Sequence, residues 1–99
     1  MDLRSMMKQA EQMQKKLQQE VEGLEVEASV GGGMVVVTMT GRKELLAIAI
    51  DPEVLDPEDP TMVQDLVLSA VNEAGRKVDA ALQERLGSLP GLGGLPGLG

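Results

Sequence analysis

The sequence predicts an α+β protein in which three short antiparallel strands lie between two long helices. Three observations support this fold class: an apolar repeat of helical spacing near the N-terminus, alternating apolar and polar residues in the middle of the chain, and a second, wider helical stripe further on. The 99 residues fit one domain, assigned to residues 1–86, followed by a flexible Leu/Pro/Gly-rich tail over residues 87–99.

Residues 2–22 are predicted to form the first helix. Apolar residues recur there at alternating steps of three and four, which places them on one side of a helix. Such a heptad seam is typical of a helix that packs against a partner. Gly23 follows and ends the helix. The residues of the seam are Leu3, Met6, Ala10, Met13 and Leu17.

The three strands are predicted as an antiparallel meander. The first, residues 24–30, alternates apolar residues with Glu and Ser, and the second, residues 34–40, is rich in Val and Thr. The glycine triplet at 31–33 forms the turn between them. We expect a loop of even length there, because an odd loop would turn the two glutamates of the first strand into the core.

The third strand, residues 43–50, is predicted to follow a two-residue loop at Gly41-Arg42. Glycine suits the first position of a type II′ turn, which is common in such hairpins. This loop fixes the register of the second hairpin and gives one bulky apolar face. The expected pairs are Val37 with Leu46 and Val35 with Ile48.

An apolar patch is also expected on the opposite face of the sheet. Such a patch often marks an association surface, although a sheet half-covered by a helix explains it equally well. A chain of this length without Phe, Tyr or Trp has a thin core, which favours an oligomer. The candidate dimer-interface residues are Met34, Val36, Leu45 and Ala47.

The second helix is predicted to run from Pro60 to about Leu86, with Asp59 as its N-cap. Its wide apolar stripe predicts that it lies on the bulky face of the sheet. The acidic connection at 51–59 contains one short turn, at 53–55. Its prolines interrupt the spacing of acids that a calcium loop needs, so we predict no metal site.

The composition excludes several classes of function. Cysteine and histidine are absent, which removes thiol nucleophiles, imidazole bases and most zinc sites. The triple glycine precedes a strand and lacks the Lys-Ser/Thr of a phosphate-binding loop. No signal peptide or membrane span is apparent. We therefore expect a cytoplasmic protein that is not an enzyme, without catalytic residues, cofactor, membrane contact or small-molecule substrate.

The charges are distributed unevenly along the chain. A net charge of −7 on its own argues against a nucleic-acid partner, since phosphate binding needs Lys and Arg. Residues 1–19 are nevertheless net positive, and Arg4, Lys8 and Lys15 fall within about 40° of one another, opposite the apolar seam. This basic stripe suits phosphate binding and an ordinary solvated face equally well. Other basic candidates are Lys16, Arg42, Lys43, Arg76, Lys77 and Arg85.

Taken together, these features resemble the YbaB/EbfC family of nucleoid-associated proteins over residues 3–86. The similarity also extends to the Leu/Pro/Gly-rich end, which is similar to the tails of that family. Short segments carry it: Met6-Met7-Lys8-Gln9-Ala10 with Gln12-Met13-Gln14, Gly31-Gly32-Gly33 entering Met34-Val35, Thr38-Met39-Thr40-Gly41, Ile48-Ala49-Ile50-Asp51-Pro52-Glu53, and Ala70-Val71-Asn72-Glu73-Ala74.

The resemblance implies a tweezers-like homodimer of α-β-β-β-α subunits with protruding helices. It also implies binding of double-stranded DNA in the bacterial cytoplasm and nucleoid, with roles in chromosome organisation and gene regulation, and no catalytic site. The charge pattern predicts contacts mainly to phosphates. An alternative is a protein-binding adaptor that acts through the heptad helix and the tail, without DNA. The predicted DNA-binding residues are Arg4, Lys8, Lys15, Lys16, Arg42, Lys43, Arg76 and Lys77.

Overall fold

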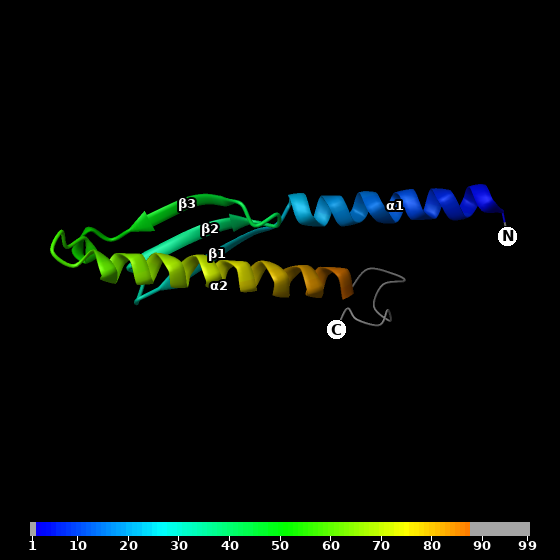
Figure 1. Ribbon diagram of the computed structural model, residues 1–99. Coiled ribbons are helices and arrows are strands. Elements are labelled where there is room, and N and C mark those ends of the chain that lie inside the picture. The colour runs from blue at the N-terminus through cyan, green and yellow to red at the C-terminus, as the bar shows by residue number, and fades with distance from the viewer. Residues whose placement is uncertain (1, 88–99) are drawn as a thin grey trace.

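The computed structural model describes residues 2–87, so the predicted tail at 87–99 lies outside the described residues except for Gly87, which is the last residue of α2. The strands form one antiparallel sheet in the order β1-β2-β3, with α2 along one face and α1 extending away from the sheet (Figure 1). The predicted α+β class and α-β-β-β-α order are confirmed. The elements are α1 (Leu3–Glu22), β1 (Glu25–Val30), β2 (Val35–Thr40), β3 (Leu45–Ile50), the 3-10 helix η1 (Pro52–Val54) and α2 (Pro60–Gly87).

The beginning of α1 and the connection before α2 follow from local sequence signals. The Asp2 carboxylate accepts a hydrogen bond from the Arg4 N–H at 3.1 Å and so caps the first turn of α1. In the connection, the Asp51 carboxylate caps η1 in the same way, through the Glu53 N–H at 3.0 Å. The short turn predicted at 53–55 is therefore present, one residue earlier in the chain. No helix within residues 2–87 is long and apolar enough to cross a membrane.

The first hairpin has the even-length loop that the sequence predicts. Val30 pairs with Val35, and the loop comprises residues 31–34. The three glycines of this loop have φ values of 63°, 67° and 94°, a region that residues with a side chain rarely adopt. Ala28 lies opposite Val37, and the glutamates of β1 remain exposed.

The second hairpin has a different register from the one predicted. The expected pairs Val37–Leu46 and Val35–Ile48 are wrong, because Val37 lies opposite Ile48 and Val35 opposite Ile50. The shift along β3 is two residues. Since side chains alternate with a period of two, an even shift keeps the same face of β3 beside the buried face of β2.

A longer loop and a bulge together cause this shift. The Thr40 N–H donates to the Glu44 carbonyl oxygen at 2.9 Å, which closes a three-residue loop over 41–43 in place of the predicted two-residue loop. The last residue of the loop, Lys43, has φ 64°, as expected where a three-residue loop ends in the left-handed region. Leu46 is the extra residue of the bulge, which lies in β3 just after the loop.

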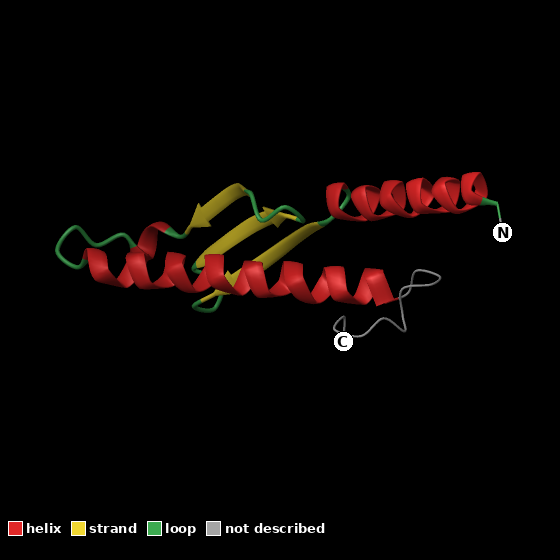
Figure 2. Ribbon diagram, turned by 45° about the vertical axis from the view of Figure 1, so that its right-hand side comes forward, coloured by secondary structure: helices red, strands yellow, loops and turns green. Residues whose placement is uncertain are grey.

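The core lies between α2 and the part of the sheet formed by β1 and β2 (Figure 2). Small residues of α2 allow the helix to approach the strands closely. By contrast, β3 is an edge strand whose first five residues are exposed. The prediction that α2 also covers Leu46 and Ile48 is wrong, since these side chains are 55% and 45% exposed. The core residues are Leu24, Ala28, Val35, Val37, Met39, Ala70, Ala74 and Val78.

Candidate nucleic-acid interface

The N-terminal helix α1 extends from the sheet and is accessible from most sides. The 20 residues of α1 make a rod about 30 Å long, within a molecule that measures 69 × 22 × 16 Å. Near the C-terminal end of α1, Glu20 Oε2 lies 3.3 Å from Arg85 Nη1 of α2. Residues 2–12 are all exposed. This shape allows α1 to reach a large ligand without obstruction from the sheet.

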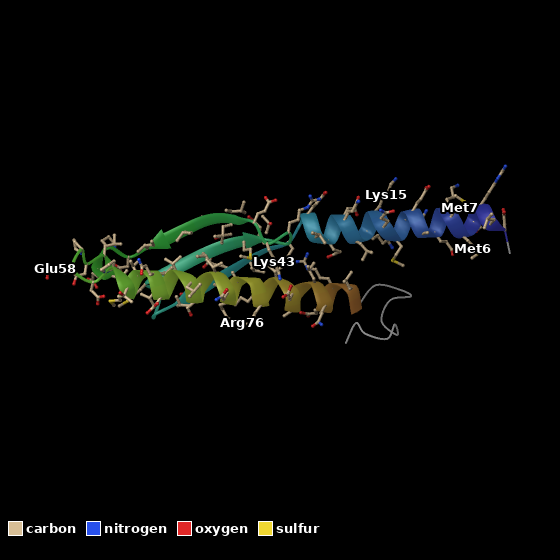
Figure 3. The ribbon with its side chains drawn as sticks, in the orientation of Figure 1. Met6, Met7, Lys15, Lys43, Glu58 and Arg76 are labelled. Atoms are coloured by element: carbon tan, nitrogen blue, oxygen red, sulfur yellow. The ribbon has the colours of Figure 1, made fainter. Side chains whose placement is uncertain are left out.

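Four exposed cations lie on this projecting helix: Arg4, Lys8, Lys15 and Lys16, here called the α1 basic group. Figure 3 shows Lys15 on the side of α1 away from Met6, as the helical spacing predicts. Lys16 lies about 100° further around the helix, so the group is broader than a single stripe. Within residues 2–87, no side-chain hydrogen bond or ion pair joins any of the four to another residue.

The remaining cations lie at the hairpin loop and on α2, and each has a partner within the subunit. Three of the four ion pairs are exposed and contribute little to stability, the pair between Arg85 and Glu20 is partly buried, and each pair neutralises a cation locally. They join Arg42 to Glu22 at 3.2 Å, Lys43 to Asp79 at 2.9 Å, Arg76 to Glu73 at 2.8 Å and Arg85 to Glu20 at 3.3 Å. The Lys77 ammonium donates to the Glu27 carbonyl oxygen at 2.8 Å.

The structure therefore divides the eight predicted DNA-binding residues into two groups. The α1 basic group is exposed and unpaired, and Glu11 is the only acid on the helix between its members. The second group comprises Arg42, Lys43, Arg76 and Lys77, here called the paired group, which lies among the acids of the sheet and α2. Sequence spacing alone gives no signal for this division, because most of the pairs join residues far apart in the chain.

The exposed side chains of the α1 basic group offer positive charge and hydrogen-bond donors. Lys and Arg side chains bind phosphate oxygens, and contacts of this kind position a duplex without identifying its bases. Arg4 and Lys16 are separated by about 18 Å along the helix axis, enough to span several phosphates. Within residues 2–87, no group of three or more acidic, Cys or His side chains is placed to hold a metal ion.

A second surface, on β3, is exposed and apolar. The predicted interface set of Met34, Val36, Leu45 and Ala47 does not share one face, because the bulge pairs Leu45 with Met39 of the buried face. The sequence analysis assigned Leu46 to the core face and not to the interface, whereas the bulge leaves its side chain exposed. The available signal was the composition of β3, which has no polar residue.

An apolar stripe of α2 also faces solvent. A shallow hollow on this stripe is lined almost wholly by apolar atoms. The bare edge strand and the stripe together exceed the scattered exposure of single apolar residues that is ordinary for a folded protein. The residues lining the hollow are Val63, Gln64, Val67, Leu68 and Val71.

Comparison with known proteins gives consistent similarities over nearly the whole chain. The profile of the YbaB/EbfC DNA-binding family matches residues 1–94. A nucleoid-associated protein of Ruminiclostridium cellulolyticum is 50% identical over 101 residues, covering 98% of this chain and 88% of that protein. One from Koribacter versatilis is 52% identical over 88 residues, covering 89% and 83%. The crystal structure of an uncharacterized protein from Helicobacter pylori aligns with a TM-score of 0.69 at 28% identity, covering 85% and 91%.

Proposed function

The chain belongs to the YbaB/EbfC DNA-binding family, and from that premise we propose that it binds duplex DNA as a homodimer, mainly through phosphate contacts made by α1. The family is a nucleoid-associated DNA-binding family and not an enzyme family. The proposed role is organisation of the nucleoid in the cytoplasm, with modulation of gene expression as a consequence of DNA binding.

The observation that carries this proposal is the unpaired state of the α1 basic group. Release of counterions from DNA drives binding when Lys and Arg approach phosphates. The rest of the chain is acidic and repels DNA, but salt screens such repulsion beyond about 8–10 Å. Because α1 extends about 30 Å, its N-terminal half, which carries Arg4 and Lys8, can meet a duplex while the acids of the sheet and α2 stay outside that range.

The homodimer in this proposal forms through β3 and the apolar stripe of α2. An exposed apolar edge strand favours pairing with another strand, and two copies related by a two-fold axis present the same surface to each other. This surface includes Leu45 and Ala47 of the predicted interface set, together with Leu46 and Ile48. Dimerisation would supply a second α1 basic group, which doubles the number of cations available to one duplex.

The salt dependence of binding tests the proposed function. A fluorescently labelled duplex is titrated with the protein at several salt concentrations, and binding is followed by anisotropy. Four to eight phosphate contacts per dimer predict a slope of log K against log [salt] of about −4 to −7. Tight binding with a flat slope would contradict phosphate contacts. Absence of binding even at the lowest salt would remove the DNA function and leave the adaptor alternative.

A charge placed on β3 is expected to separate the dimer. Glutamate at Leu46 would be brought into an apolar interface and repelled by its symmetry mate, so Leu46→Glu is expected to be monomeric where wild type is dimeric. Met7→Glu is the matched control, because Met7 is 58% exposed against 55% for Leu46 and lies on α1, away from β3 and the stripe of α2. Light scattering gives the mass of each variant. A Leu46→Glu variant as dimeric as the control would place the interface elsewhere.

A further inference from the structure

The apolar seam on α1 continues beyond its contact with α2 and has no partner there. Met13 and Leu17 are half-buried, but nearer the N-terminus Leu3 is 70% exposed and Met6 is 48% exposed. This exposed part of the seam lies on a rod in solvent, where apolar side chains of this size cost free energy unless something covers them. Its occupant must be apolar, and Arg4, Lys8 and Lys15 would stay accessible beside it because they lie on the opposite side of α1.

We propose that residues 88–99, the Leu/Pro/Gly-rich end of the same subunit, dock along the exposed seam of α1 formed by Leu3, Met6, Ala10 and Met13. This replaces the expectation of a flexible extension. The proposal concerns a contact within one chain and does not depend on DNA binding.

The first argument is the point at which this segment leaves α2. The last turn of α2 lies beside α1 at the ion pair between Arg85 and Glu20 (Figure 1). Glu20 follows Met6 and Met13 at seven-residue spacing, so the three lie on one side of α1. Figure 3 shows Met6 on the side of α1 on which α2 ends. The chain therefore continues from Gly87 next to the seam.

The second argument is length. The seam from Leu17 to Leu3 spans about 21 Å along the helix axis. Twelve residues follow Gly87 and reach at most about 40 Å when extended. The segment is thus long enough to follow the whole exposed seam. A tether this short also gives an effective concentration in the millimolar range, so weak contacts suffice for docking within one subunit.

The third argument is the pattern of the segment itself. Leucine occurs at every third position, 89, 92, 95 and 98, with prolines at 90 and 96. Three residues make one turn of a polyproline II helix, so in that conformation this spacing would place all four leucines on one side, about 9 Å apart. The seam of α1 repeats every seven residues, or about 10.5 Å. The two apolar rows therefore have similar spacing, and the segment carries no charge that would favour the basic side.

A spin label tests the contact in the full-length protein. The chain has no cysteine, so Gly97→Cys provides a single site for a nitroxide. The nitroxide is expected to enhance the relaxation of the amide protons of residues 3–13. This enhancement should not depend on protein concentration, because the contact lies within one subunit. Met6→Ser is expected to weaken docking by about 10-fold, because it removes a side chain that docking would bury. Gln12→Ser is the control, since Gln12 is also exposed but lies on the side of α1 away from the seam.

Each contrary outcome overturns the proposal. No relaxation at residues 3–13 would mean that the segment does not reach α1. Equal effects of Met6→Ser and Gln12→Ser would mean that contact is not made through the seam. A sample that mixes spin-labelled subunits without isotope label and isotope-labelled subunits without spin label distinguishes contact within one subunit from contact between two subunits. If relaxation appears only between subunits, the occupant of the seam belongs to a second copy of the chain.

Discussion

Replacing the α1 basic group with glutamine is expected to weaken duplex binding by about 100-fold or more at low salt. Each cation near a phosphate contributes to counterion release, and a set of such contacts accounts for several powers of ten in affinity. The dependence on salt should flatten in parallel, because fewer ions are released. Glutamine retains a high helix propensity, so α1 should remain helical. The variant is Arg4→Gln/Lys8→Gln/Lys15→Gln/Lys16→Gln, measured by anisotropy beside wild type.

The paired group supplies the matched control for this experiment. Replacing its four members with glutamine lowers the formal net charge by the same amount, but removes cations that already have partners on the sheet and α2. This control is expected to bind DNA within a few-fold of wild type. Equal losses in the two variants would show that net charge, and not the position of the cations on α1, determines affinity. Circular dichroism and light scattering verify that both variants remain folded and dimeric.

The sequence was sufficient to predict the elements of the fold because their signals are local. The heptad seam, the alternation in β1 and the glycine triplet each determine the conformation of a few neighbouring residues. Helical spacing likewise placed Lys15 opposite Met6, as the structure has it (Figure 3). The same pattern could not show that the α1 basic group is unpaired, since pairing depends on acids brought close by the fold.

The wrong predictions concern the second hairpin and the coverage of β3, where the sequence is compatible with more than one structure. The sequence is compatible with either a two-residue or a three-residue loop that begins at Gly41. With the longer loop, the extra residue Leu46 in the bulge is what keeps Ile48 opposite Val37. The extent of α2 coverage was equally undetermined, because one helix is too narrow to cover three strands. As a result, Leu46 and Ile48 were expected in the core and instead form part of an exposed edge.

Gly41 was predicted correctly as a loop glycine but for the wrong physical reason, and the correct reason predicts a large loss of stability. A type II′ turn would need positive φ at this position, yet Lys43 has it and Gly41 does not. Gly41 is required because the hairpin approaches the end of α1 closely: its N–H donates to the Leu24 carbonyl oxygen at 3.0 Å. An added Cβ would collide with the Val21 carbonyl oxygen and lie 3.1 Å from the Leu24 Cβ.

Gly41→Ala is therefore expected to lower the free energy of unfolding by about 2–4 kcal/mol. Gly75→Ala is the control, because a Cβ there meets nothing within 4 Å and alanine favours the helical conformation of α2. That control should raise stability by up to about 1 kcal/mol. Urea unfolding followed by circular dichroism, at one protein concentration, measures both, since the chain lacks Trp and Tyr.

The physical basis of the difference is the kind of atom that each new methyl group meets. At Gly41 the nearest atom is a backbone carbonyl oxygen, so no change of side-chain rotamer relieves the collision. Relief requires separation of the hairpin from the end of α1, which would break the Gly41–Leu24 hydrogen bond and expose Leu24, a buried core residue. Stability equal to wild type in Gly41→Ala would show instead that α1 moves relative to the sheet at little cost.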